Sequence, residues 1–438
     1  MEHRARRVFS ASVLLPFSVL VLAAGLRLWA LDSPPGPYWD EGWYALDAAA
    51  YIGQAHPARY PAPPPTVHIA ADQTWVHPPL GKWAIALGEA PLGRTPVGWR
   101  LPSALFGIAG VGIVYLIGLA LFDSKWWAAL SALLLAVDGL HTVQSRMAML
   151  DIFLSTFVSA GVLMIVLERS KRERGYEPSP GKAQRWFGSR YRLWAGLFLG
   201  AAVATKWSGT LPLALAIVLS AGGFFGPGSL RHRILESFDA LVVVPLGVYV
   251  ASYSQFWIEH GLAIKSFLVL QWRMLEYGLA DPYRHAAQSA PWTWLLLLHP
   301  ARYLPPTGSP VVPGVHRILA LGNPILWWGF LLCLPFLAYS STHDWRDGVI
   351  LGFLAFQYLP WLVVGRGEYI WYVLPAVPFM CLGLASTLRR LPPRVRVQVA
   401  VGVSTLAVST AVLFSPVWIG FGVPSRWMDT LRWLPAWH

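Results

Sequence analysis

The sequence predicts an all-α integral membrane protein in which residues 1–438 form a single polytopic membrane domain. The chain is 55% hydrophobic and only 13% charged, whereas about a quarter of an ordinary soluble domain is charged. Apolar stretches with almost no charge recur along it, and most have the roughly 16 to 25 residues that a helix needs to cross a hydrocarbon core. These observations exclude a soluble enzyme, a nucleic-acid-binding protein and a secreted disulfide-linked scaffold.

About eleven transmembrane helices are expected. The first apolar run follows Arg4, Arg6 and Arg7 as in a signal peptide, but no small-residue cleavage site comes after it, so we interpret it as a retained membrane anchor. In chain order, the predicted spans cover residues 8–31, 100–121, 126–142, 149–167, 193–206, 208–226, 238–257, 322–340, 348–365, 369–388 and 397–419.

The distribution of basic residues predicts the orientation of these helices. With the N-terminus in the cytoplasm, the cytoplasmic segments hold most of the Lys and Arg residues, including eight between Arg169 and Arg192. Short cytoplasmic connections are enriched in such residues. The same orientation places two long segments, 32–99 and 258–321, outside the cytoplasm, and function is expected in these loops because they are too long to be simple turns.

The first of these loops is expected to contain two short surface helices. Segments 41–54 and 79–92 flank the run Pro61–Pro65, which cannot be helical. The second loop is rich in Trp, Tyr and Pro, a composition typical of a membrane interface.

An acidic pair surrounded by aromatic residues, Asp40–Glu41, follows the first predicted span. One interpretation is structural, because Asp favours the N-cap of a helix and a Pro-rich turn precedes it. The other is catalytic: a carboxylate at a water-facing site, with its pKa adjusted by apolar surroundings, can act as a general base. The residues alone leave both interpretations open.

Several cations stand at predicted helix ends. His77 and Lys82 lie in the first outer loop, Arg100 begins the second span, and Arg146 and Lys206 lie at the ends of later spans. Each of them alone is explained by long basic side chains that reach for lipid headgroups.

Their shared location favours a functional interpretation. Carboxylates and cations at one membrane face suit a substrate with an anionic phosphate, held at headgroup depth by a lipid tail, and a hydroxyl to be deprotonated. The predicted topology brings to this face Asp40, Glu41, His77, Lys82, Arg100, Asp138, Arg146, Asp151, Lys206, Arg366 and Glu368.

The motifs along the chain resemble those of the protein O-mannosyltransferases, membrane glycosyltransferases of the GT-C type that use dolichyl- or polyprenyl-phosphate mannose. Together with Asp40–Glu41, the resemblance is carried, in family order, by VHPPLGK (Val76–Lys82), GWRLPSALFG around Arg100, SRMAMLD ending at Asp151, KWSG from Lys206, SAPWTW (Ser289–Trp294), Gly322–Asn323–Pro324 and YIWYVLPAVPF (Tyr369–Phe379).

The resemblance implies a compact bacterial form. The β-trefoil domain that eukaryotic members carry has no room in 258–321, and Trp39 precedes the acidic pair where the family usually has Phe. A multi-pass protein of the bacterial inner membrane is expected, with its active site outside and its acceptor, an exported polypeptide, met near the secretion channel.

The resemblance also implies a mechanism with inversion at the sugar. Asp40 would deprotonate a Ser or Thr hydroxyl while the lipid phosphate leaves, and Glu41 would orient a cation or the acceptor. The phosphate would be met by Arg100 first and Lys82 second, with His77 as a hydrogen-bond donor. Further site candidates are Arg146, Asp151, Lys206, Tyr369 and Tyr372.

No metal is expected at this site. The chain has no HExxH, DxD or Cys-rich spacing, and a phosphate leaving group needs no general acid, although Asp40 and Asp151 could in principle share a cation. The alternatives are a related enzyme that uses another lipid-linked sugar or a lipid or glycan acceptor, and a transporter or flippase. A transporter would place ionisable residues near the membrane midplane in an internal repeat, and we find no repeat.

Overall fold

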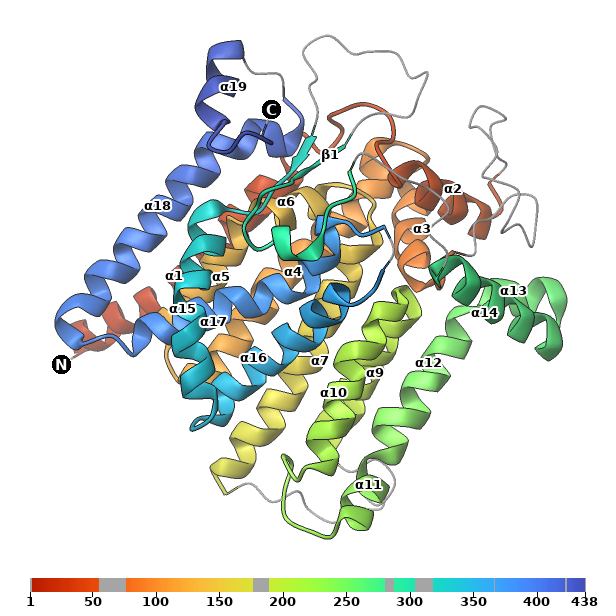
Figure 1. Ribbon diagram of the computed structural model, residues 1–438, viewed down its shortest axis with the longest axis horizontal. Helices are drawn as coiled ribbons and strands as arrows, with labels where there is room; N and C mark the ends of the chain where they lie inside the picture. Colours follow the sequence, from red (N-terminus) through yellow and green to blue (C-terminus); the bar gives the residue numbers. More distant parts are fainter. Residues whose placement is uncertain are drawn as a thin grey trace.

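The computed structural model describes residues 2–54, 76–175, 189–279, 287–303, 318–365, 367–421 and 424–437, with side chains from residue 14 onward in the first helix. Most of these residues are helical, as the sequence predicts (Figure 1). The run Pro61–Pro65, part of the basic connection 168–192, and Arg366 lie outside the described residues.

The helices, in chain order, are α1 (Glu2–Leu28), α2 (Glu41–Tyr51), α3 (Leu80–Leu92), α4 (Pro96–Phe122), α5 (Lys125–Ala136), α6 (Gly139–Arg146), α7 (Leu150–Glu173), α9 (Arg190–Thr205), α10 (Thr210–Ala221), α11 (Leu230–Phe238), α12 (Val244–Ser252), α13 (Ser254–His260), α14 (Ile264–Leu279), α15 (Pro324–Ser341), α16 (Trp345–Tyr358), α17 (Val377–Arg389), α18 (Pro393–Ile419) and α19 (Ser425–Leu431). Shorter helical turns are η1 (Trp207–Gly209), η2 (Asp239–Val243), η3 (Pro291–Thr293), η4 (Leu359–Leu362) and η5 (Ile370–Ala376), and two strands, β1 (Ala301–Tyr303) and β2 (Ile318–Ala320), pair antiparallel.

Helices and helical turns cover most of each of the eleven predicted spans, although the span 126–142 is interrupted, and the predicted surface helices correspond to α2 and α3. Within the described part of the chain, six helices are long and apolar enough to cross a membrane, or seven if the bent pair α5–α6 counts as one span. The six run over Pro96–Phe122, Leu150–Glu173, Leu230–Ser252, Pro324–Ser341, Ile370–Arg389 and Pro393–Ile419. The β1–β2 ribbon in the loop 258–321 is the departure from the predicted all-helical fold.

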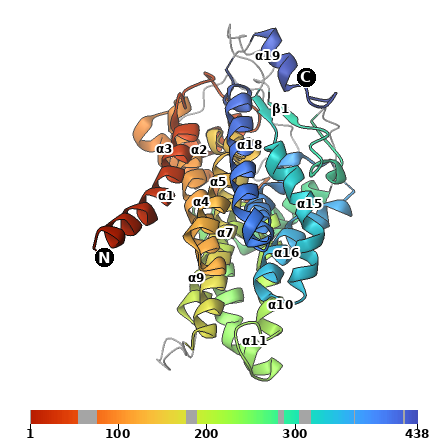
Figure 2. The same ribbon diagram turned by 90° about the vertical axis from the view of Figure 1, so that its left-hand side faces the viewer.

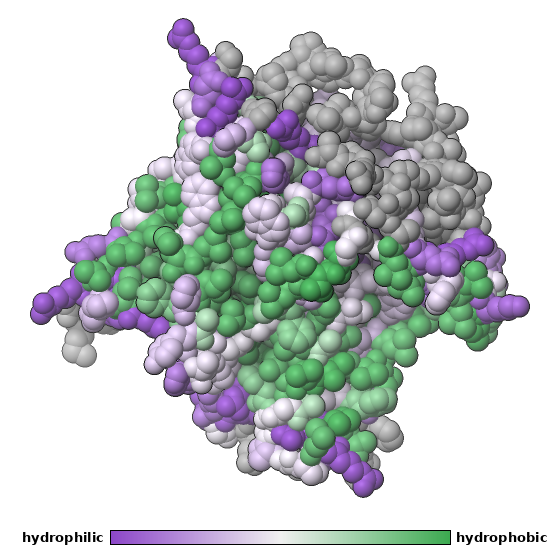
Figure 3. Space-filling model, viewed as in Figure 1, coloured by the Kyte–Doolittle hydropathy of each residue, from purple (hydrophilic) through white to green (hydrophobic). Residues whose placement is uncertain are grey.

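The interior of the bundle is formed by α7 and by η5 with α17. Within the 18-residue apolar stretch of each of these two segments, 83% and 89% of the residues are buried. The corresponding share in α18 is 22%, so α18 lies at the periphery. Apolar side chains gather on the flank of the bundle in Figure 3, as expected for a surface that faces lipid.

The expected straight span 126–142 is broken. Helices α5 and α6 meet at a bend of 61° beside Asp138. The Asp138 carboxylate accepts hydrogen bonds from the backbone N–H of His141 and of Asn323 and from the Trp327 indole, while the Arg27 guanidinium donates to carbonyls at the end of α5. The break therefore leaves its polar groups paired, as a membrane interior requires.

Helices α2 and α3, the short helix α6 and the β1–β2 ribbon lie at one end of the bundle, and α11 lies at the opposite end (Figures 1 and 2). The acidic pair at the start of α2 is therefore at the end that the charge distribution predicts to be extracytoplasmic.

Candidate active site

Glu41, the first residue of α2, is held in place by several hydrogen bonds. Its side chain is fully buried. The carboxylate accepts hydrogen bonds from Nε and Nη2 of Arg100, both at 2.9 Å, and from the backbone N–H groups of Tyr38 and Ala148, both at 3.0 Å. Four donors on two oxygens fix Glu41 as an anchor that orients a cation, one of the roles expected from the sequence.

Arg100 has no donor left for a substrate. Its five N–H groups are used by the two Glu41 oxygens and by the backbone carbonyls of Leu31, Pro34 and Gly36, at 2.8 to 3.2 Å. A guanidinium carries five such groups. This geometry argues against the expectation that Arg100 is the first ligand of the donor phosphate, and it makes Arg100 the clamp that ties the segment before α2 to α4.

Asp40, the neighbour of Glu41, has the opposite environment. It occupies the N-cap position of α2, but its side chain makes no capping hydrogen bond. Among the described residues, no group donates a hydrogen bond to this partly buried carboxylate. The structural interpretation as a side-chain cap therefore does not account for Asp40.

Charges near Asp40 act on its ionisation. Burial raises the pKa of the Asp40 carboxyl from 3.8 to about 6, the Lys206 ammonium opposes this rise, and the Asp151 carboxylate adds to it. A carboxylate with a pKa near 6 is ionised at neutral pH and is a stronger base than an ordinary aspartate.

Lys206 and Asp151 form a buried pair beside Asp40. The Lys206 ammonium lies 2.8 and 3.0 Å from the two Asp151 oxygens, and it also lies over the Tyr372 ring, 4.6 Å from its centroid. Tyr369 stacks on Trp371, with ring centroids 4.4 Å apart. The structure thus brings Asp151, Lys206 and Tyr372, from three distant segments, to the same place as Asp40.

Lys82 and His77 lie close to side chains of α2. The Lys82 ammonium is 2.7 Å from the Asp47 carboxylate, and both side chains are buried, so this pair ties α3 to α2. A β-carbon at the preceding residue, Gly81, would stand 2.8 Å from the Leu150 side chain, so glycine permits this close packing of α3 on α7. The His77 ring is partly exposed and lies 6.3 Å from the Tyr44 ring.

Arg146 has a structural role at the end of α1. Its guanidinium is almost fully buried. The four carbonyls that accept its hydrogen bonds, at 2.7 to 3.3 Å, are those of Leu26, Arg27, Trp29 and Ala30. These carbonyls lie at the end of the first helix, where backbone acceptors lack partners within the helix, so the geometry does not support Arg146 as a substrate ligand.

Three aromatic residues of this region are not among the site candidates predicted from the sequence. Tyr44 is buried beside Asp40, and burial raises the pKa of its hydroxyl well above the usual value. Trp39 stacks on Tyr303, which comes from β1. The aromatic run around Asp40 was a signal for Trp39 and Tyr44, whereas nothing in the sequence connects Tyr303 with Asp40. Within the described residues, no group of three or more His, Cys, Asp or Glu is placed to hold a metal ion.

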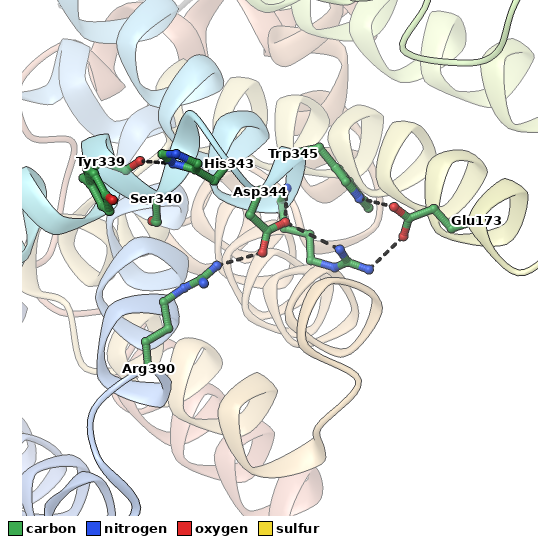
Figure 4. Close-up of a pocket in the computed structure, with 8 residues that line it drawn as sticks. Glu173, Tyr339, Ser340, His343, Asp344, Trp345 and Arg390 are labelled. Carbon is green, nitrogen blue, oxygen red and sulfur yellow. Dashed lines mark hydrogen bonds and ion pairs between the residues drawn. The ribbon is translucent and has the colours of Figure 1, made fainter.

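A pocket of about 530 Å³ lies at a different place, where the ends of α7, α15 and α17 meet the start of α16 (Figure 4). Arg346 pairs there with Glu173 and Asp344, and Arg390 pairs with Asp344 and Asp347. None of the residues predicted for the site lines this pocket.

Comparison with known proteins agrees with the motifs. A protein from Mycobacterium tuberculosis named polyprenol-phosphate-mannose–protein mannosyltransferase is 29% identical over 430 residues, which cover 83% of this chain and 81% of that protein. A protein of the same name from Corynebacterium glutamicum is 26% identical, with 83% and 81% covered.

Solved structures share the fold. A chain in the S. cerevisiae protein O-mannosyltransferase Pmt1-Pmt2 complex bound to the sugar donor superimposes with a TM-score of 0.80 at 14% identity, over 97% of this chain and 92% of that chain. ArnT from Cupriavidus metallidurans bound to undecaprenyl phosphate gives a TM-score of 0.59 at 17% identity, over 94% and 65%. The fold is therefore that of the GT-C membrane glycosyltransferases.

The family model described as dolichyl-phosphate-mannose-protein mannosyltransferase matches residues 17–260, more than half of the chain and the part that holds Asp40, Asp151 and Lys206. The chain belongs to this family of membrane mannosyltransferases.

Proposed function

We propose that this chain transfers mannose from a polyprenyl-phosphate donor to Ser or Thr hydroxyls of exported proteins, with inversion at the anomeric carbon. The observation that carries the proposal is Asp40: a partly buried carboxylate without a described hydrogen-bond donor, next to the Asp151–Lys206 pair. The names of the bacterial relatives and the donor-bound yeast complex support the choice of donor and acceptor.

In this mechanism Asp40 removes the proton from the acceptor hydroxyl as that oxygen attacks the anomeric carbon. The bond from this carbon to the phosphate oxygen breaks, and the lipid phosphate leaves with the bonding electrons. One displacement inverts the centre, so a β-linked donor gives an α-linked product. Glu41 takes no proton in this scheme, because its oxygens are bound by four donors and serve to fix the start of α2.

The leaving phosphate needs positive or hydrogen-bonding partners. We assign this role first to His77, which is partly exposed and lies beside Tyr44. Lys82 contributes its charge from its pair with Asp47. Arg100 acts indirectly by holding Glu41. The His77→Ala protein should therefore require more donor for half-maximal rate while its melting temperature changes little.

The proposal includes an orientation in the bacterial inner membrane. The N-terminus and segment 168–192 face the cytoplasm, and loops 32–99 and 258–321 face outside, where an exported polypeptide is met near the secretion channel. A cysteine placed in 176–188 should resist impermeant thiol reagents in intact cells. Ready labelling there would show that the topology is the reverse of the one proposed.

The decisive experiment supplies purified protein in liposomes with radiolabelled polyprenyl-phosphate mannose and follows the label. Transfer to an acceptor peptide supports the proposal, and transfer to a lipid or glycan identifies the related-enzyme alternative. Movement of intact donor between leaflets without transfer identifies a flippase. Repeating the assay with a chelator tests whether a divalent metal takes part.

A further inference from the structure

The residue before the candidate base has an unusual backbone. Trp39 has a φ of 54°, in the left-handed region that side chains other than glycine rarely adopt. The Glu41 N–H donates to the Tyr38 carbonyl, so Trp39 and Asp40 are the central residues of a turn. With a φ of −66° at Asp40, only the first central residue has positive φ, a pattern in which that position is usually glycine.

Aromatic contacts hold Trp39 in this conformation. Its indole stacks on Tyr303, with centroids 5.4 Å apart and planes at 21°, and it meets the edge of Trp371 at 5.6 Å. Tyr303 and Trp371 also contact each other, and the Tyr303 hydroxyl accepts a hydrogen bond from the buried Gln144 amide. Strain of this kind persists only where the surroundings impose it.

We propose that Trp39 is a positioning residue for transfer: its indole, clamped by Tyr303 and Trp371, sets the direction of the adjacent, partly buried Asp40 carboxylate and limits the access of water to it. This inference rests on the proposed function, in which Asp40 is the base. Glycine could occupy this position of the turn without strain, yet the position is occupied by tryptophan, the largest residue. The Trp39 side chain contacts β1 and η5. The clamp thus fixes a carboxylate that no described hydrogen bond holds.

The first test compares Trp39→Gly with Trp39→Phe in the transfer assay. Glycine suits the turn, so the variant should fold, while the clamp is lost. Turnover should fall about 10²-fold, the usual effect of a small misplacement of a catalytic group, and the donor concentration for half-maximal rate should change little. Trp39→Phe, which keeps a ring, should recover most of the turnover. Wild-type turnover in Trp39→Gly would overturn the proposal, and so would a Phe variant as slow as the Gly variant.

A second test needs no transfer activity, so it separates this inference from the proposed function. The difference in melting temperature between a protein and its Asp40→Asn variant, followed from pH 4 to 7, reports the ionisation of Asp40. In the native background this difference should change between about pH 4 and pH 6 and be constant above pH 6. In the Trp39→Gly background, where Asp40 is more open to water, its folded pKa should approach the usual value, so the pH-dependent change should become smaller and end at lower pH. An unchanged pH dependence would contradict the proposed limit on the access of water.

Other charged and titratable groups around Asp40 are unchanged in this comparison. Should Trp39→Gly fail to fold, Tyr303→Leu against Tyr303→Phe gives the same contrast, with lower turnover expected for leucine and equal turnover counting against the proposal. The groups that act on Asp40 or its neighbours from the surrounding elements are Lys206, Asp151, Tyr44, Tyr303, Tyr372 and Tyr277.

Discussion

At the end of the bundle that carries α2, the Asp40 carboxylate has no described hydrogen-bond donor. At the opposite end, Asp344 and Asp347 are each paired with Arg390, and Asp347 also accepts hydrogen bonds from Ser340 and Ser386. That end contains the open pocket of Figure 4, yet every carboxylate that lines it is neutralised. Under the proposed mechanism, the reacting group is the carboxylate at the α2 end, and the pocket at the opposite end takes no part in the reaction.

The largest expected effect follows from replacing Asp40. Asn has nearly the same shape but cannot accept a proton at neutral pH, so Asp40→Asn should lower transfer by about 10²–10⁴-fold, the usual contribution of a general base. Donor binding should change little, and both quantities can be measured on one purified protein.

The folding of Asp40→Asn provides the control. Burial gives Asp40 a higher pKa in the folded state, so its ionisation lowers stability as the pH rises through the range from 3.8 to about 6. Above that range, the Asn variant should melt no lower than the native protein. A variant that keeps most of its transfer rate would return Asp40 to a structural role, and Asp151 would be tested next.

Arg100→Ala comes second, and its effect should be on folding. Removing the guanidinium leaves the buried Glu41 carboxylate with backbone donors but without a charged partner, which costs about 3 to 5 kcal/mol. The variant should therefore melt at a clearly lower temperature in detergent. If it melted normally and only bound donor poorly, the original expectation of Arg100 as a phosphate ligand would be restored.

The pH dependence of transfer gives a third, smaller effect. The base form of Asp40 predominates above its pKa of about 6, so the rate should fall about tenfold for each pH unit below that value. Lys206→Met should move this fall to higher pH, because the ammonium that favours ionised Asp40 is lost. A rate independent of pH from 5 to 7 would exclude Asp40 as the base.

The smallest effect is expected at the opposite end. Arg346 pairs with Glu173 and Asp344 at the protein surface, and such pairs contribute about 0.2 to 1 kcal/mol. Arg346→Ala should leave transfer unchanged and lower the melting temperature slightly. A marked loss of transfer would mean that the paired end takes part in the reaction after all.

Charge and hydropathy were sufficient to predict where most helices lie and the shared location of Asp40, Asp151 and Lys206, because the membrane constrains the length of each span and therefore which span ends meet. They could not predict what Arg100 and Arg146 bind. The partners of these residues are largely backbone carbonyls, which every residue has and no sequence pattern marks. The contact between Trp39 and Tyr303 joins positions far apart in the chain, and its geometry depends on tertiary packing alone.

The break between α5 and α6 has a consequence for biogenesis. Asp138 is satisfied by the backbone of Asn323 and the indole of Trp327, residues that a ribosome adds long after α6 has been made. Until then, an unbroken helix is the state that pairs the most backbone groups of this segment in lipid. We therefore expect residues 125–146 to enter the membrane as one continuous helix and to bend only when α15 arrives, which would make assembly of this end of the enzyme a late, post-insertion event.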